Sequence, residues 1–364
     1  MNRFGFIIHP ISVADVARKY PVARFLPGRL VESVVRRRSP VVVGEMSGIR
    51  STHDGSEVSG VFVACPLTTR TMLTEPPERT LPVIIAAAQK AASEGARIVG
   101  LGAMTSVVGD AGITVSRNVD IAVTTGNSYT VATALQGARR AAELMHVDVR
   151  RATVAIIGAT GSIGRTCAQI MAAETARVVL VIRDVEKAEA LASELRATPG
   201  CDADIVVSND LDAVLPTADI LVCVSASADA LVQPRHLKPG AVVCDVARPR
   251  DVSVAVARER DDVLVIEGGV VRPPGDNVDL GFNFGFPAGM LYACMAETSL
   301  LALLGRYENY SLGRELEPAK VLEIAALAEL HGYRLAGFRS FERAVADADI
   351  EAIRLRAARH PAPA

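Results

Sequence analysis

The sequence predicts an α/β protein in which a doubly wound parallel sheet is preceded by a second α/β domain and followed by a helical segment. Three observations lead to this fold class. The chain of 364 residues is long enough for two domains. From residue 151 onward, short runs of Val, Ile and Leu alternate with helical stretches, as a parallel sheet covered on both faces requires. A glycine-rich turn joins the first of these runs to the helix after it.

The first domain is predicted over residues 1–148, where glycines and short polar linkers separate apolar runs from helical stretches. Because the second half carries the glycine-rich turn, this α/β half is the expected substrate domain. Its strands are expected at residues 4–10, 41–51, 60–67 and 97–103, and its helices at residues 81–96 and 128–147.

The second domain is predicted over residues 149–287 and shows a regular strand and helix alternation. Near-continuous Val, Ile and Leu runs indicate strands buried on both faces. The strands are expected at residues 152–159, 177–183, 203–208, 218–225, 240–247 and 263–269, and the helices at residues 164–174 and 187–197.

The third part, residues 288–364, is predicted to be a helical segment. Helices are expected at residues 318–333 and 340–359. The segment begins with the apolar run LYACMAETSLL at 291–301, which places Cys294 in an otherwise buried pattern.

Composition narrows the class of protein further. Half of the residues are hydrophobic, and a formal charge of −2 gives no signal for nucleic acid. No run of 18 apolar residues occurs, and the N-terminal stretch lacks a cleavable signal pattern, so we expect a cytoplasmic protein without a membrane span. The six cysteines and six histidines are scattered without metal-ligand spacing, and no metal site is predicted.

The glycine-rich turn GATGSIGR has the layout of a Rossmann dinucleotide site. Gly158 allows the tight turn, Gly161 leaves room for a pyrophosphate, and Gly164 lets helix and strand pack closely. The helix N–H groups then face the phosphates. Three of the four residues between these glycines are also included in the predicted site, namely Thr160, Ser162 and Ile163.

Arg183, at the end of the second strand, predicts which dinucleotide is bound. An NAD site normally places a carboxylate there, whereas a guanidinium suits the 2′-phosphate of NADPH. NADPH is therefore the predicted cofactor, although Asp184 could instead bind the ribose. Later strand ends are expected to complete the cleft, and the residues assigned to it are Ser225, Ala226, Asp245 and Gly268. Asp245 suits a structural cap equally well.

The stretch VTTGNSYT lies directly before a long helix. Its polar residues can cap that helix, and they can also hold a substrate carbonyl. The candidate substrate residues are Thr125, Gly126, Asn127 and Ser128.

Residues 1–40 carry eight basic and two acidic side chains. This segment is either a solvated basic face or a docking surface for an acidic partner.

The chain resembles the long-chain acyl-[acyl-carrier-protein] reductases of the cyanobacterial type over roughly residues 1–335. The motifs that carry the resemblance are FGFIIHPIS, GLGAMTSVV, TTGNSYTVA, ATVAIIGATGSIG, ADILVCVSAS, IEGGVV, LYACMAETSLL and YSLGR. The resemblance implies NADPH-dependent reduction of an acyl thioester to a fatty aldehyde. It also implies that Cys294 is the nucleophile, that acyl carrier protein or coenzyme A is the acyl donor, and that an aldehyde-consuming enzyme is a partner.

The chemistry is consistent with this resemblance, because a cysteine thiolate can take the acyl group before hydride reduces it. A helix N-terminus would favour the thiolate only within its first turn. That condition is met if the helix begins near Tyr292 and fails if it begins at Pro287. Glu297, on the same helical face, is a candidate for proton transfer or a structural carboxylate.

Two other functions stay open from the sequence. A shikimate- or quinate-type dehydrogenase has the same domain order, but the stretch CPLTTR lacks the lysine that such a substrate loop carries. A non-catalytic protein that senses NADPH or binds a carrier would keep the cofactor site without turnover.

Overall fold

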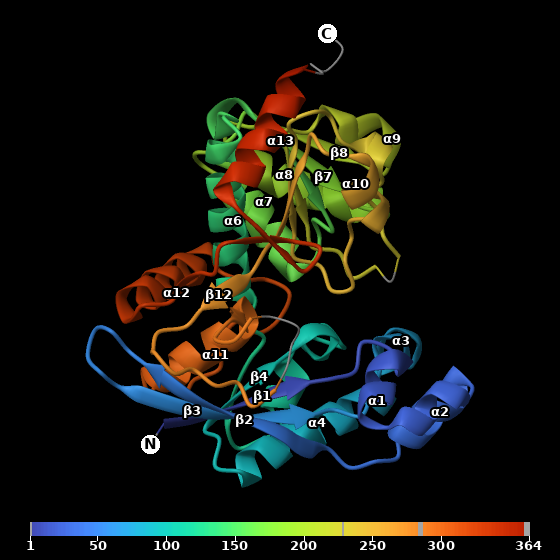
Figure 1. Cartoon of the computed structure of the whole chain (residues 1–364), viewed down its shortest axis with the longest axis vertical. Coiled ribbons are helices and arrows are strands. Elements are labelled where there is room, and N and C mark those ends of the chain that lie inside the picture. The colour runs from blue at the N-terminus through green and yellow to red at the C-terminus, as the bar shows by residue number, and fades with distance from the viewer. Residues whose placement is uncertain (1, 228, 283–286, 360–364) are drawn as a thin grey trace. The chain divides into compact units, whose positions relative to one another are not determined.

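The computed structural model describes residues 2–227, 229–282 and 287–359 (Figure 1). The chain divides into two compact units, each assembled from separate stretches. Unit 1 comprises Met1–Tyr129, Val271–Arg314 and Glu323–Arg334, and unit 2 comprises Thr130–Val270, Glu315–Leu322 and Leu335–Ala364. The predicted boundary at residue 148 thus lies inside unit 2, and the predicted third part, 288–364, contributes to both units.

Unit 1 is built on a five-stranded sheet in the order β2-β3-β1-β4-β5. The pairs β3–β1, β1–β4 and β4–β5 are parallel, and the edge strand β2 is antiparallel to β3. The strands are β1 (Asn2–Ile8), β2 (Val41–Arg50), β3 (Glu57–Ala64), β4 (Ile98–Leu101) and β5 (Ala122–Thr124). All four strands predicted for this half occur, and β5 was not predicted.

Helices cover both faces of the unit 1 sheet. Successive side chains of a strand point to opposite faces, and apolar residues at both sets of positions pack against helices. Gly5 and Ile7 face α4 (Pro77–Ser93), and a Cβ on Gly5 would lie 2.5 Å from Ala91. Phe6 and Gly100 face α11 (Ala293–Leu303), where a Cβ on Gly100 would meet Thr298. The two helices lie on opposite sides of the sheet (Figure 1).

Shorter helices complete unit 1. A small layer with its own core of Val16, Ala17, Ala23 and Val31 is formed by the first three helices of the chain. The further elements of the unit are α1 (Val13–Lys19), η1 (Pro21–Phe25), α2 (Gly28–Val35), α3 (Thr69–Thr74), η2 (Ala103–Ser106), α5 (Ile113–Ser116) and β13 (Leu291–Tyr292). At the boundaries between the two units lie α6 (Asn127–Leu144), β12 (Val270–Arg272), α12 (Pro318–His331) and β14 (Arg334–Leu335).

Unit 2 is built on a six-stranded, fully parallel sheet in the order β11-β10-β9-β6-β7-β8. Counted from β6, this is the strand order 3-2-1-4-5-6 of a doubly wound Rossmann fold. After β8 the chain crosses to β9 on the other side of β6, so the switch point lies between the neighbouring strands β6 and β9, which is where such folds bind dinucleotides. The strands are β6 (Thr153–Ile157), β7 (Arg177–Val181), β8 (Asp204–Ser208), β9 (Ile220–Cys223), β10 (Val242–Asp245) and β11 (Leu264–Glu267).

The predicted α/β class with a Rossmann domain and C-terminal helices is confirmed, and each of the six strands predicted from residue 152 onward occurs. The strand core is almost wholly aliphatic, as expected for strands buried on both faces. The helices of unit 2 are η3 (Val149–Arg151), α7 (Ser162–Ala172), α8 (Val185–Ala197), α9 (Leu211–Val214), η4 (Leu215–Thr217), η5 (Pro234–His236), α10 (Val254–Glu259) and α13 (Asp347–Arg359).

The helix predicted at 340–359 is wrong in its first part. The hairpin of β15 (Phe338–Ser340) and β16 (Arg343–Val345) occupies that stretch, and α13 begins only at Asp347. The hairpin turn needs left-handed backbone at Phe341 and Glu342, whose φ angles are 46° and 69°. The Glu342 N–H donates to the Glu267 carboxylate at 2.7 Å, so a tertiary contact outweighs local helical preference.

Candidate functional site

The glycine turn of unit 2 is shaped by two close approaches. Gly158 has φ of 86°, and a Cβ there would lie 2.8 Å from the Ser225 Cα at the end of β9. A Cβ on Gly164 would lie 2.3 Å from the Gly158 carbonyl oxygen. Glycine is therefore required at both positions, one for the turn and one for packing helix against strand.

Gly161 differs from these two glycines because space remains around it. A Cβ there would meet only the Gly158 carbonyl oxygen, at 3.3 Å. Gly161 is also the N-cap of α7, and no side chain caps that helix. Thr160, Ser162 and Ile163 beside it are partly exposed. An exposed glycine at an uncapped helix N-terminus is a cradle that fits a dinucleotide phosphate.

Arg183 and Asp184 follow β7 with different surroundings. The Asp184 carboxylate caps α8 by accepting from the Lys187 N–H at 3.4 Å, and it pairs with the Lys187 ammonium at 2.9 Å. These Lys187 contacts lower the pKa of Asp184. Arg183 is exposed and makes no ion pair with the described residues. Asp184 therefore serves as the cap of α8, and the role of Arg183 at a ribose phosphate stays a prediction.

Asp245 and Ser225 organise the loops after β10 and β9. Asp245 is almost fully buried and accepts from the Ala247 and Val252 N–H groups, both at 3.1 Å. Burial raises the pKa of Asp245 to about 6. The Asp251 carboxylate accepts from the Ser225 N–H at 2.9 Å and from its hydroxyl. Asp245 thus caps its own loop, which is one of its two predicted roles.

Two further predicted residues of unit 2 lie at strand ends. Ala226 is exposed directly after Ser225. Gly268 follows β11, and a Cβ there would lie 2.7 Å from the Cys244 sulfur. Asp251 was not predicted as a site residue. The sequence feature that could have indicated it is an acidic residue in the loop that follows β10.

Cys294 is the second residue of α11, which begins at Ala293 with Tyr292 as its N-cap. The condition for a favoured thiolate, a position in the first helical turn, is therefore met. Every other residue of α11 is buried, and only Cys294 is partly exposed. The sequence alone did not determine where this helix begins.

Four of the other cysteines differ from Cys294 in burial. They lie in the interior, where burial raises the pKa of each thiol, in Cys65 and Cys167 to about 12. These four are Cys65, Cys167, Cys223 and Cys244. Cys201 is partly exposed like Cys294, but it lies in a loop after α8.

The loop after β5 lies directly against Cys294. Gly126 has φ of 73°, and a Cβ there would lie 2.3 Å from both the Cα and the Cβ of Cys294. No side chain fits between this loop and the thiol-bearing residue. The structure therefore brings the predicted substrate residue Gly126 into contact with the predicted nucleophile, although 168 residues separate them in sequence.

Glu297 holds that loop in place. It is fully buried, and its carboxylate accepts from the Thr124 hydroxyl and, at 2.8 Å, from the Tyr129 N–H in the first turn of α6. Burial raises the pKa of Glu297, while these hydrogen bonds act in the opposite direction. Such contacts give Glu297 the role of an N-terminal cap for α6 supplied by another helix.

Ser311 ties the rest of the loop. Its carbonyl oxygen accepts from the Thr125 hydroxyl, and its own hydroxyl donates to the Ser128 hydroxyl at 2.7 Å. Ser311 itself has left-handed backbone, with φ of 50°. Asn127 is the buried first residue of α6. Ser311 was not predicted as a site residue, although it lies within the YSLGR motif.

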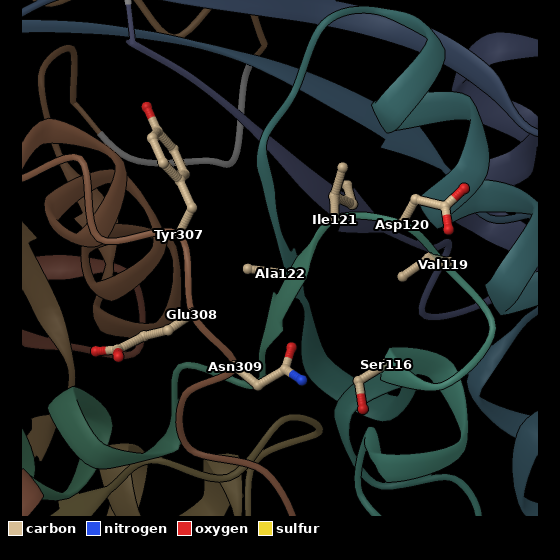
Figure 2. A pocket seen from close by; sticks show the side chains of 8 residues that line it. All are labelled: Ser116, Val119, Asp120, Ile121, Ala122, Tyr307, Glu308 and Asn309. Atoms are coloured by element: carbon tan, nitrogen blue, oxygen red, sulfur yellow. The ribbon is translucent and has the colours of Figure 1, made fainter.

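A polar hollow of about 400 Å³ lies at the β5 edge of unit 1 (Figure 2). The carboxylates of Asp120 and Glu308 point away from each other there, and no predicted site residue lines it. Within the described ranges, no group of three or more His, Cys, Asp or Glu residues could hold a metal ion. No described helix is long and apolar enough to cross a membrane.

Known proteins resemble parts of this chain. The family model for shikimate / quinate 5-dehydrogenase matches residues 139–267, all within unit 2. Aminotransferase PigE of a Serratia species is 32% identical over 342 residues, which are 91% of this chain and 39% of that protein.

Two reductases are also similar. Long-chain acyl-[acyl-carrier-protein] reductase of Synechococcus elongatus is 29% identical over 221 residues, 58% of this chain and 61% of that protein. Glutamyl-tRNA reductase of Psychrobacter cryohalolentis is 27% identical over 195 residues, 49% of this chain and 41% of that protein. The chain thus spans less than two thirds of each of the three relatives.

These likenesses and the glycine turn support an NAD(P)-dependent oxidoreductase whose cofactor is NADP(H). The resemblance to acyl reductases stated from the sequence agrees with the similarity to the Synechococcus elongatus enzyme, which covers 58% of the chain. The family model matches within unit 2, and the residues around Cys294 lie outside the matched range.

Proposed function

We propose that this protein is an NADPH-dependent reductase that converts a long-chain acyl thioester to a fatty aldehyde through an acyl-Cys294 intermediate. The observation that carries the proposal is the packing of Gly126 against Cys294 in the first turn of α11. This contact places the polar loop at residues 124–128 beside Cys294, the one partly exposed residue of α11, where the loop can hold an incoming carbonyl next to the thiol.

In the first half of the reaction, the Cys294 thiolate attacks the thioester carbonyl carbon. A new carbon–sulfur bond forms to Cys294, the bond to the donor sulfur breaks, and the donor leaves as a thiol after taking up a proton. The positive end of α11 favours both the thiolate and the negative oxygen that develops on the carbonyl.

In the second half, NADPH, when bound, supplies the hydride that reduces the acyl carbon. Cys294 then leaves as a thiolate, which restores the nucleophile and releases the aldehyde. The residues that would hold the cofactor lie in unit 2, with Gly158, Gly161 and Gly164 at the pyrophosphate and Arg183 at the 2′-phosphate.

Glu297 is a positioning residue in this scheme. Its carboxylate is engaged by the Thr124 hydroxyl and the Tyr129 N–H, so it fixes the loop that carries Gly126. Thr125, Asn127 and Ser128 line the same loop, which borders the acyl carbonyl. The donor is acyl carrier protein or acyl-CoA, and the aldehyde passes to a consuming enzyme.

The shikimate- or quinate-type dehydrogenase is the second candidate, and the match of that family model to residues 139–267 favours it. That match bears on the cofactor-binding unit. It does not extend to Cys294, Glu297 or the loop around Gly126, which the acyl-transfer scheme uses.

Intact-mass spectrometry of the full chain tests the proposal. The protein is incubated with a long-chain acyl thioester without NADPH, and we expect one acyl adduct that maps to Cys294. Cys294→Ala should lose the adduct and at least about 1,000-fold in reductase activity. Cys201→Ala, which changes the other partly exposed thiol, is the control and should keep both.

Adding NADPH to the acylated protein should release aldehyde. An adduct that survives Cys294→Ala, or none in the unaltered protein, contradicts the covalent route. Shikimate or quinate oxidation without aldehyde formation would establish the second candidate instead.

A further inference from the structure

The segment from Tyr20 to Val34 presents an unusual set of exposed large apolar side chains. Phe25 is 87% exposed and Val22 66% exposed. Single exposed apolar residues are ordinary, but a dense group of them marks an interaction surface. The group, called here the α1–α2 surface, consists of Tyr20, Val22, Phe25, Leu26, Leu30 and Val34.

These side chains are not needed for the core of their own segment. Val31 is buried in the small core that α1, η1 and α2 share, and Val35 packs against it. Leu30 and Val34 are four residues apart and form a second stripe of α2 that is about half exposed. The eight-residue helix α2 is thus apolar on its inner face and again on part of its outer face.

Basic side chains flank the same surface. Four exposed arginines make no ion pair with the described residues, namely Arg24, Arg29, Arg37 and Arg38. The carboxylate of Glu32, the single acidic residue of α2, accepts from Arg70 and from the Thr68 hydroxyl, and it also interacts electrostatically with Arg29. The segment therefore combines exposed apolar side chains with exposed arginines that make no ion pair with the described residues.

The geometry points to peripheral binding of the α1–α2 surface to an anionic lipid bilayer. Interfacial segments combine protruding aromatic and aliphatic side chains with arginines that meet headgroup phosphates. A protein partner would have to supply a cavity shaped for Phe25, whereas a bilayer accepts protruding side chains of any arrangement. In such binding the protruding side chains would lie in the interfacial plane of the bilayer.

Flotation of the full chain with lipid vesicles tests this binding. We expect the protein to float with phosphatidylcholine vesicles that contain about one third phosphatidylglycerol, and not with pure phosphatidylcholine. High salt should weaken binding, because it screens the arginines.

Two variants separate the contributions. The double variant Phe25→Ser/Leu30→Ser should lower vesicle partitioning at least about tenfold, and Arg24→Glu/Arg29→Glu should lower it comparably at low salt. The matched control Val254→Ser/Leu355→Ser removes two exposed apolar side chains elsewhere and should bind like the unaltered protein. Unchanged circular-dichroism melting would show that each variant is folded.

No flotation of the unaltered protein with anionic vesicles would overturn the proposal. Equal partitioning of Phe25→Ser/Leu30→Ser and the control would do so as well. A different outcome would assign the surface to acyl carrier protein: Arg24→Glu/Arg29→Glu raises the KM for the acylated carrier protein, and the unaltered protein does not bind vesicles. The proposal does not depend on the acyl reductase activity, because the vesicle measurement uses neither substrate nor cofactor.

Discussion

The glycine turn of unit 2 and the Cys294 site of unit 1 are built in opposite ways. The turn is local: Gly158, Gly161 and Gly164 lie within seven residues, and each has a role that backbone geometry explains. The Cys294 site joins three distant stretches around residues 124–129, 294–297 and 311. A local pattern can be recognised along the sequence, whereas a distributed site depends on packing. Four substitutions test this contrast.

Gly126→Ala should have the largest effect of the four. Its Cβ would lie 2.3 Å from two atoms of Cys294, so either the loop or the nucleophile must move. A displacement of about 1 Å is enough to lower acylation roughly 100-fold. The measurement is the rate of acyl-adduct formation without NADPH.

Gly200→Ala is the matched control for this change. Gly200 also has a left-handed φ, 83°, but a Cβ there would meet nothing within 4 Å. It therefore carries the backbone strain without the clash. Equal losses of acylation in both variants would mean that the contact with Cys294 is unimportant.

Glu297→Gln should lower acylation about tenfold, because the amide keeps one acceptor and presents a donor to the Thr124 hydroxyl or the Tyr129 N–H. If Glu297 only positions the loop, the variant should show the same pH profile of acylation as the unaltered protein, at a lower rate. Loss of one limb of that profile would instead assign proton transfer to Glu297. Glu297→Asp, which keeps the charge with a shorter reach, should recover part of the rate.

Gly161→Ala should affect only the cofactor half of the reaction. The added Cβ would lie 3.3 Å from the Gly158 carbonyl oxygen, a contact that a small shift relieves, and it would occupy the space next to the helix N-terminus where a phosphate would lie. We expect the Kd for NADPH to rise about tenfold, measured by fluorescence titration, with acylation unchanged. A tenfold loss in the rate of acylation as well would mean that the glycine turn and the Cys294 site do not act in separate halves of the reaction.

Asp245→Asn should have the smallest effect on activity and a visible effect on stability. Burial raises the pKa of Asp245 to about 6 from an ordinary value of 3.8. Below pH 3.8 the carboxyl is neutral in both states, and above pH 6 the folded state holds a buried charge. The unaltered protein should therefore lose up to roughly 3 kcal/mol between those limits relative to the variant.

Chemical denaturation across this pH range measures that difference. Asp184→Asn is the control with the opposite sign, because the Lys187 contacts lower the pKa of Asp184; its stabilising contribution is present above pH 3.8 and is lost only as pH falls below that value. A pH-independent difference between Asp245→Asn and the unaltered protein would contradict the buried-charge account.

Local rules predicted most of the fold. The strand positions followed from aliphatic runs, and the doubly wound parallel sheet followed from their alternation with helices. The strand β5, only three residues long, was missed because it carries too little pattern. The hairpin at 338–345 was missed because its turn depends on a contact with Glu267, which no local preference encodes.

The sequence by itself determined the parallel sheet of unit 2 and its glycine turn, because both depend on neighbouring residues and on backbone sterics. Its resemblance to acyl reductases also singled out Cys294 among six cysteines. Only the tertiary structure decided that α11 begins at Ala293, that Gly126 lies against Cys294 and that Glu297 caps α6. These three facts depend on how distant segments pack on one sheet, where close approach sets which side chains fit.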